Sequence, residues 1–393
     1  MSDDAGTEQG AARTFSRAKT KARLLALQVV ASALLIYAAL WRFEAYDLPH
    51  AYYLWLGHIR QVGPTQAFAA PFGDYSPPYL YLLAAISPFG LSPLNTIKTV
   101  STGAAILMAL ALRRLVQSAG VPKSDEAALL SLLVPSAVMN SALLGQCDGY
   151  WVGLCLFAVA AACRGRVFAM AAWAGLAFAF KAQAIFIAPF CIGVVLQHRR
   201  LEAVLIPPAI YILVMLPAWF AGWPMADLLT VYVRQHGLFE WLSTAPNLWA
   251  SVGYFDQFPA RWVIASAYLA TAISVAVYLW RFPKALVPAA LLSAMMLPWL
   301  LPKMHERYLL LADMLAFSLP WIMQRTGRIF VCIQVGSVLS IFAWITSLPA
   351  LNIIASLFVG VGLISVVSLV RTSANDGLNR DDGSPPPADL RTR

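Results

Sequence analysis

Long apolar runs alternate with short polar connections along most of the chain. A hydrocarbon core about 30 Å thick needs about 20 apolar helical residues to be crossed, so we expect these runs to be membrane helices. The pattern predicts an all-α polytopic membrane protein with about twelve transmembrane helices. The expected spans are about 24–41, 95–115, 126–144, 149–163, 167–180, 183–197, 201–221, 261–280, 285–301, 308–324, 329–347 and 350–370.

Basic residues mark which connections face the cytoplasm. In this arrangement the basic clusters follow even numbers of crossings, which predicts cytoplasmic termini. Segment 1–23 is then a basic tail, 24–370 one membrane-embedded domain, and 371–393 a disordered tail. The two long outer loops, at about 42–94 and 222–260, are where we expect chemistry. The basic clusters expected on the cytoplasmic side are Arg113/Arg114/Lys123, Arg164/Arg166, Arg199/Arg200, Arg281/Lys284, Arg325/Arg328 and Arg371.

Composition narrows the class of protein. The chain of 393 residues is 60% hydrophobic and 12% charged, with a mean hydropathy of +0.68. Soluble domains carry about 25% charged residues, so a cytosolic enzyme, a nucleic-acid binder and a disulfide scaffold are excluded. The net charge of +9 reports loop orientation and not an anionic partner. The five cysteines have no disulfide or metal-binding spacing, and no cofactor is predicted. A divalent metal stays open as an alternative wherever two carboxylates meet a phosphate, although no dedicated ligand spacing indicates one.

The first outer loop holds two candidate carboxylates. Asp47 precedes an amphipathic helix in which Leu48, Tyr52, Trp55 and Ile59 share one face, and we expect that helix to lie in the outer membrane interface. Capping of this helix is the alternative role for Asp47. Farther on, Asp74 and Tyr75 precede a helix-start signal at Ser76 and an apolar run too short to cross the membrane. Fixing the turn is the alternative role for Asp74.

Polar residues also interrupt the apolar runs at their expected outer ends. Gln146 and Asp148 lie between two runs, and capping of the second run is the alternative role for Asp148. Lys181 and Gln183 interrupt a long apolar stretch. A lysine there either reaches the outer surface or faces the protein interior as a functional charge.

The densest cluster of charge lies between two late apolar runs. Lys303, His305, Glu306 and Arg307 lie within five consecutive positions, and such charge near a membrane indicates a functional site. The three basic side chains suit a phosphate or pyrophosphate. Cations that extend to the membrane surface are the alternative. Asp313 follows in the next run and is expected to pair with one of these cations. Nucleotide-binding motifs and His-x-x-x-His spacings are absent from the sequence.

These motifs, taken in order, resemble a known family. They are the early Asp47, Asp74-Tyr75-Ser76-Pro77-Pro78, Gly145-Gln146-Cys147-Asp148, Lys181-Ala182-Gln183, Asn247-Leu248-Trp249 and Lys303-Met304-His305-Glu306-Arg307-Tyr308. The set is similar to bacterial integral-membrane glycosyltransferases related to the second GPI mannosyltransferase, which share the GT-C fold. The resemblance covers most of the membrane body, from about Asp47 to Asp313.

The resemblance implies an inverting glycosyltransferase in the bacterial inner membrane. It would move a hexose from a polyprenyl-phosphate-linked donor to a lipid or glycan acceptor at the periplasmic face. Asp47 matches the catalytic base, and Glu44 is the backup because the residue before Asp47 departs from the family pattern. The donor phosphate would be held by Lys181, Lys303, His305 and Arg307. Residues expected to orient the substrates are Asp74, Tyr75, Gln146, Asp148, Gln183, Asn247, Trp249 and Glu306.

Two further classes remain open from the sequence. A transporter or flippase for a lipid-linked sugar would place charge along a pathway through the membrane. A transporter or flippase is expected to have inverted repeats and charged residues near the midplane of the membrane, whereas these ionisable residues gather at one membrane face. A polymerase or ligase that uses a lipid-linked oligosaccharide would also carry its site outside. The sequence does not separate it from the transferase.

Overall fold

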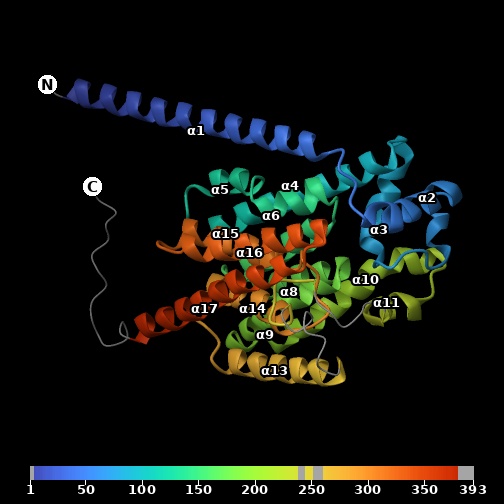
Figure 1. Cartoon of the computed structure of the whole chain (residues 1–393). Coiled ribbons are helices and arrows are strands. Elements are labelled where there is room, and N and C mark those ends of the chain that lie inside the picture. Colours follow the sequence, from blue (N-terminus) through green and yellow to red (C-terminus); the bar gives the residue numbers. More distant parts are fainter. Residues whose placement is uncertain (1–3, 238–243, 251–259, 379–393) are drawn as a thin grey trace.

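The computed structural model describes residues 4–237, 244–250 and 260–378, and these residues form helices with no strand among them (Figure 1). Short turns of 3-10 or π helix at Leu48–Tyr52, Gln66–Ala69, Ser87–Phe89, Met139–Leu143, Ala182–Ile187 and Leu201–Leu205 join several of them. The helices are α1 (Asp4–Leu40), α2 (Tyr53–Val62), α3 (Pro77–Ile86), α4 (Pro93–Ser118), α5 (Ser124–Ser131), α6 (Pro135–Val138), α7 (Asp148–Ala162), α8 (Val167–Phe180), α9 (Ala188–Gln197), α10 (Ile206–Ala221), α11 (Met225–Gly237), α13 (Ala260–Trp280), α14 (Leu286–Leu300), α15 (Leu310–Ile322), α16 (Gly327–Thr346) and α17 (Ala350–Leu378).

Six segments within the described residues are long and apolar enough to cross a membrane, which gives the chain the architecture of a polytopic membrane protein. A seventh crossing arises if α5 and the segment Pro135–Leu143, which meet at 50°, form one broken span. The six are Arg23–Leu40, Pro93–Ser118, Leu201–Ala221, Arg261–Trp280, Gly327–Thr346 and Ala350–Thr372.

Each of the twelve predicted apolar runs coincides with a helix or a broken helix, so the prediction of helices is confirmed. Five of these helical segments span only 10 to 17 residues, and twelve full crossings therefore stay a prediction. Several of the short helices form the interior of the bundle, where α7 is buried along almost its whole length. Their sequences are apolar on all sides, as expected for helices surrounded by other helices.

Two glycines set the close packing between α4 and α7. Gly149 and Gly153 are four residues apart and lie on the face of α7 that packs along α4. A Cβ atom at Gly149 would lie 2.9 Å from the backbone oxygen of Ala104, so a larger residue would push the helices apart. Small residues at this spacing let membrane helices approach closely. The contact fixes the start of α7, which carries Asp148.

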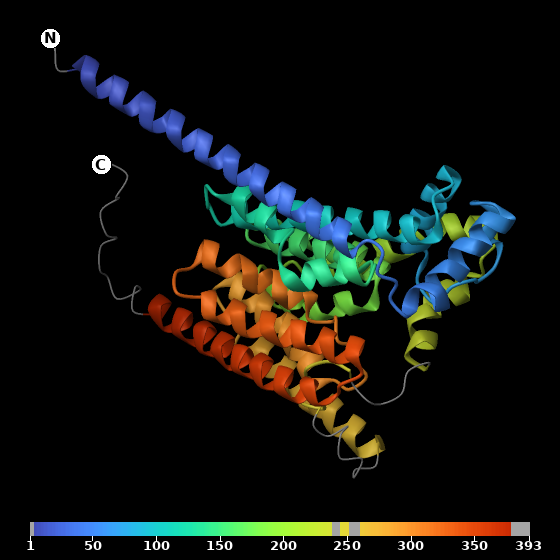
Figure 2. The ribbon, with the colours of Figure 1, turned by 45° about the horizontal axis from the view of Figure 1, so that its top comes forward.

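The helices of the first outer loop gather at one end of the bundle with α11, while the beginning of α1 and the end of α17 lie at the opposite end (Figures 1 and 2). The amphipathic helix after Asp47 is confirmed, but its environment differs from the prediction. Tyr52 and Trp55 are buried and pack against Tyr75 and Tyr79 in edge-on or tilted contacts, so this face contacts protein and not lipid headgroups. Aromatic pairs in this geometry add stabilisation beyond burial.

Candidate functional site

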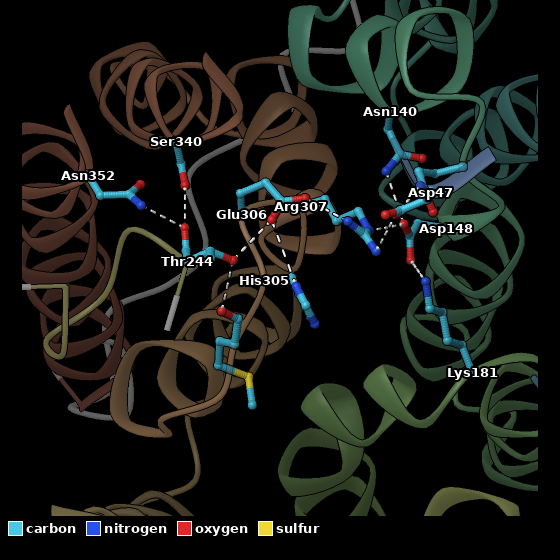
Figure 3. Close-up of polar contacts among 12 residues, drawn as sticks. Asp47, Asn140, Asp148, Lys181, Thr244, His305, Glu306, Arg307, Ser340 and Asn352 are labelled. Atoms are coloured by element: carbon cyan, nitrogen blue, oxygen red, sulfur yellow. Dashed lines mark hydrogen bonds and ion pairs between the residues drawn. The ribbon is translucent and has the colours of Figure 1, made fainter. Parts of the chain in front are cut away.

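Arg307 is the centre of a buried charge cluster at the end of the bundle where α2 and α3 lie. Its guanidinium nitrogens are 2.6 Å from Glu306 Oε1, 3.3 Å from Asp47 Oδ2 and 3.5 Å from Asp148 Oδ2. Figure 3 shows Glu306 on one side of this guanidinium and the two aspartates on the other. The planar guanidinium spreads its donors over three nitrogens and can contact carboxylates on opposite sides, whereas the three donors of a lysine ammonium share one nitrogen. Arg307 therefore joins the first outer loop, the start of α7 and the turn before α15.

Asp148 is completely buried, and both of its carboxylate oxygens are engaged. Oδ1 accepts hydrogen bonds from Lys181 Nζ at 2.6 Å and Trp151 Nε1 at 2.9 Å. Oδ2 accepts one from Asn140 Nδ2 at 3.1 Å and also faces Arg307. The predicted alternative, an aspartate that only caps α7, does not account for these contacts. Asp148 is an anchor for two buried cations.

Asp47 lies at the rim of the same cluster, with 27% of its side chain exposed. It precedes the π turn Leu48–Tyr52, yet its side chain makes no capping hydrogen bond to that turn. Oδ2 instead accepts a hydrogen bond from Gln146 Nε2 at 2.9 Å, and Gln146 in turn accepts one from Tyr52 at 2.6 Å. The amide and Arg307 together fix a carboxylate that is still accessible from outside the protein.

The polypeptide that carries Arg307 is held in place by the described segment 244–250. Asn247 Nδ2 donates to the backbone oxygens of Pro298 and Leu301, and Trp249 Nε1 donates to that of Leu300. These carbonyls end α14, where a helix leaves acceptors without partners. Asn247 and Trp249 thus position the turn after α14, and their contact with a substrate stays a prediction.

Thr244 secures the middle of the turn that follows α14. Its hydroxyl donates to Glu306 Oε2 at 3.1 Å, and its backbone N–H donates to the oxygen of Met304 at 2.9 Å. Its own carbonyl oxygen accepts from Ser340 and Asn352, which belong to α16 and α17 (Figure 3). The charge cluster is therefore connected to the last two helices of the bundle.

His305 is neutral at pH 7. Burial, and to a smaller extent the positive charge of Arg307, lower the pKa of its imidazole to about 4. Burial alone would raise the pKa of Glu306, but Arg307 and His305 hold it below its ordinary value. A contact from His305 to a phosphate would then be an ordinary hydrogen bond and not an ion pair.

The pKa of His305 predicts that acidic pH destabilises the protein. Between pH 6.5 and 4 the unfolded chain binds a proton at this histidine that the folded protein does not, so the free energy of unfolding falls with pH. The melting temperature in detergent should drop from pH 7 to pH 5, and His305→Gln should reduce the drop. His50→Gln, at an exposed histidine, is the control. Equal drops for wild type and His305→Gln would contradict the prediction.

Lys303 lies apart from the charge cluster and lines a cavity of about 220 Å³. Its backbone has a φ of +60°, in the left-handed region. A left-handed backbone at a residue other than glycine costs about 1 to 3 kcal/mol and tends to occur at functional sites. Gln183 and Gln235 also line the cavity, and Gln183 Oε1 is buried without a hydrogen bond from any described residue. The cavity offers a cation and amides to a polar ligand.

The cavity adjoins both the charge cluster and an apolar groove. The ring of Tyr308, which lines the cavity, meets the ring of His305 at 5.1 Å between centroids. Ile185 and Tyr232 line the cavity and also a groove of about 580 Å³ between α8, α9, α10 and α11. The remaining groove residues are almost all apolar. A polar cavity and an apolar groove are thus neighbours.

Several predicted site residues come together, and others do not. Asp74 and Glu44 are exposed; Asp74 makes no ion pair within the described residues, and the charge of Glu44 acts on Tyr53, outside the cluster. Tyr75 places its ring 5.0 Å from Lys181 Nζ. Asp313 accepts a hydrogen bond from Ser337 at 3.0 Å, and its predicted pairing with a cation of the 303–307 cluster is wrong. The cluster brings together Asp47, Gln146, Asp148, Lys181, His305, Glu306 and Arg307.

Sequence reasoning missed two residues that hold the cluster. Asn140 donates to Asp148, and Thr244 donates to Glu306. Asn140 is a lone amide within an apolar run, a signal that could have identified it, because an unpaired amide is costly there. Thr244 lies in the long outer loop at about 222–260, where no pattern distinguishes it.

No family model and no curated protein matches this chain.

Proposed function

We propose that the protein is an inverting glycosyltransferase that moves a hexose from a polyprenyl-phosphate-linked donor to a lipid or glycan acceptor. The observation that carries the proposal is the position of Asp47. This carboxylate is accessible, is held by Gln146 and Arg307, and lies at the same end of the bundle as a cationic cavity that adjoins an apolar groove. Polyprenyl-linked substrates need such a combination, because a polar reaction takes place on a molecule with a hydrocarbon tail.

In the proposed reaction Asp47 is the general base. Its carboxylate accepts the proton of the acceptor hydroxyl as that oxygen attacks the anomeric carbon of the donor sugar. A bond forms from the acceptor oxygen to this carbon, the bond to the phosphate oxygen breaks, and the configuration inverts. The phosphate leaves with the electron pair of the broken bond. Gln146 and Arg307 fix the direction of the carboxylate, which reduces the cost of alignment.

The charge balance favours Lys303 over Arg307 as the ligand of the departing phosphate. Arg307 already faces three carboxylates. Their three negative charges are offset by two positive charges, those of Arg307 itself and Lys181. With His305 neutral, the cluster has an excess of carboxylates and would repel a second anion. Lys303 makes no ion pair within the described residues and lines the adjoining cavity. Growing charge on the phosphate would be stabilised there.

Replacement of Lys303 tests this assignment. Lys303→Gln removes one charge-assisted contact to the phosphate, which contributes about 1.5 to 3 kcal/mol, so donor affinity should fall by about 10- to 100-fold. The measurement is binding of a polyprenyl-phosphate-hexose to purified protein in detergent. Lys284→Gln, at an exposed lysine before α14, is the matched control and should bind as wild type does. Unchanged binding by Lys303→Gln would remove the cavity from the donor site.

The proposed site faces the periplasm, with both ends of the chain in the cytoplasm, and cysteine labelling tests this orientation. Gly57 is exposed at the site end of the bundle, and Gly327 begins α16 at the other end; a Cβ atom at either position meets nothing within 4 Å. In a background without native cysteines, Gly57→Cys should react with an impermeant reagent added to intact cells, and Gly327→Cys should react only after lysis. The reverse pattern would place the site in the cytoplasm.

A further inference from the structure

A basic cleft lies at the end of the bundle opposite the charge cluster. It has a volume of about 450 Å³ and is lined by Arg166, His198 and Arg200 together with the first residues of α8. Helix α8 ends beside Lys181, so its beginning lies about 20 Å away at 1.5 Å per residue. The cleft is therefore separate from the proposed glycosyltransferase site.

The cations of this cleft are poorly compensated. Arg200 lies 3.6 Å from Glu202, and both side chains are more than half exposed, so solvent weakens this pair. Arg166 makes no ion pair within the described residues. Partial burial and the nearby charges of Arg114 and Arg166 lower the pKa of Arg164, which shows that cations are crowded here. A bound anion would relieve this repulsion.

Apolar side chains border the cleft. Phe168 is 45% exposed, and its ring lies 6.0 Å from the guanidinium of Arg200. Leu201 and Leu205, on the turn that follows Arg200, are 62% and 71% exposed. A free phosphate would use the basic side chains alone, whereas a phospholipid would use both surfaces. Basic pockets between membrane helices at the cytoplasmic face favour anionic lipid headgroups.

We propose that this cleft binds an anionic phospholipid of the adjoining leaflet. The headgroup phosphate contacts Arg166 and Arg200, and one acyl chain lies over Phe168, Leu201 and Leu205. The N–H groups of the first turn of α8, which have no carbonyl partner within the helix, face the same phosphate. The loop between α7 and α8 and the loop between α9 and α10 lie on either side of the cleft. The bound lipid contacts both loops and thereby links them.

Native mass spectrometry and melting temperatures with defined lipids test the proposal. Wild-type protein should retain phosphatidylglycerol and melt at a higher temperature with it than with phosphatidylcholine. The double variant Arg166→Gln/Arg200→Gln should bind phosphatidylglycerol roughly tenfold more weakly or worse, because charge-assisted contacts are lost. Its melting temperature in phosphatidylcholine should match wild type, since these side chains are exposed.

The control is Arg325→Gln/Arg328→Gln, a pair of exposed arginines at the connection between α15 and α16 on the same face, and it should bind phosphatidylglycerol as wild type does. Equal binding by the cleft variant and wild type would overturn the proposal. An equal rise in the melting temperature of wild type with inorganic phosphate and with phosphatidylglycerol would also overturn the proposal, because the apolar side chains beside the cleft would then contribute nothing to binding.

Discussion

Replacement of Arg307 by lysine is expected to lower the free energy of unfolding by about 3 to 5 kcal/mol, the loss that follows when a buried ion pair is broken. The substitution keeps the positive charge, but one ammonium cannot contact Glu306, Asp47 and Asp148 together. Glu306 is the most sensitive of the three, because it is fully buried and, with His305 neutral, Arg307 is its one charged partner among the described residues. The melting temperature of the purified variant in detergent measures the effect.

The matched control for this variant is Arg234→Lys. Arg234 pairs with Asp227 on α11, and both side chains are well exposed, so this ion pair contributes about 0 to 1 kcal/mol. The control should melt close to wild type. An Arg307→Lys protein that also melts as wild type would show that the three carboxylates do not depend on the guanidinium.

Asp47→Asn is expected to reduce turnover by about 10² to 10⁴ while the protein stays folded. The amide keeps the size of the side chain and can still accept the hydrogen bond from Gln146, but it cannot take a proton from an acceptor hydroxyl. Arg307 keeps its contacts with Glu306 and Asp148, so the cluster retains two of its three carboxylates. Single-turnover rates separate the loss of chemistry from a change in donor binding.

Two variants in the same loop serve as controls for Asp47→Asn. Asp74→Asn alters an exposed carboxylate that lies outside the charge cluster, and it should leave turnover unchanged. Glu44→Gln tests the backup base, which is exposed and near Tyr53, and it should have little effect. A larger loss in Glu44→Gln than in Asp47→Asn would transfer the role of base to Glu44.

The helices could be predicted because their signal is local. An apolar run of the right length is sufficient to predict a helix, and each predicted run coincides with a helical segment. Membrane crossing was less predictable for the short runs. Helix α7 is apolar on all sides because other helices surround it, and composition does not distinguish this environment from lipid.

The partners of the charged residues could not be predicted. The motif 303–307 indicates four ionisable side chains at one place, but not that Lys303 lines a cavity while Arg307 pairs with carboxylates. The pairing of Arg307 with Asp47 joins residues that are far apart in the sequence. The basic side chains of Lys303, His305 and Arg307 fit a phosphate site and an internal ion-pair network equally well until their distances to the carboxylates are known.

Sugar transfer by purified protein tests the central claim most directly. Wild type and Asp47→Asn, reconstituted with a bacterial lipid extract as acceptor, would receive a radiolabelled polyprenyl-phosphate-hexose. We expect wild type to move the label to an acceptor and to release one polyprenyl phosphate per sugar transferred, while folded Asp47→Asn is about 10² to 10⁴ times slower. Equal donor consumption by the two proteins, or movement of intact donor across the bilayer without cleavage, would contradict the account.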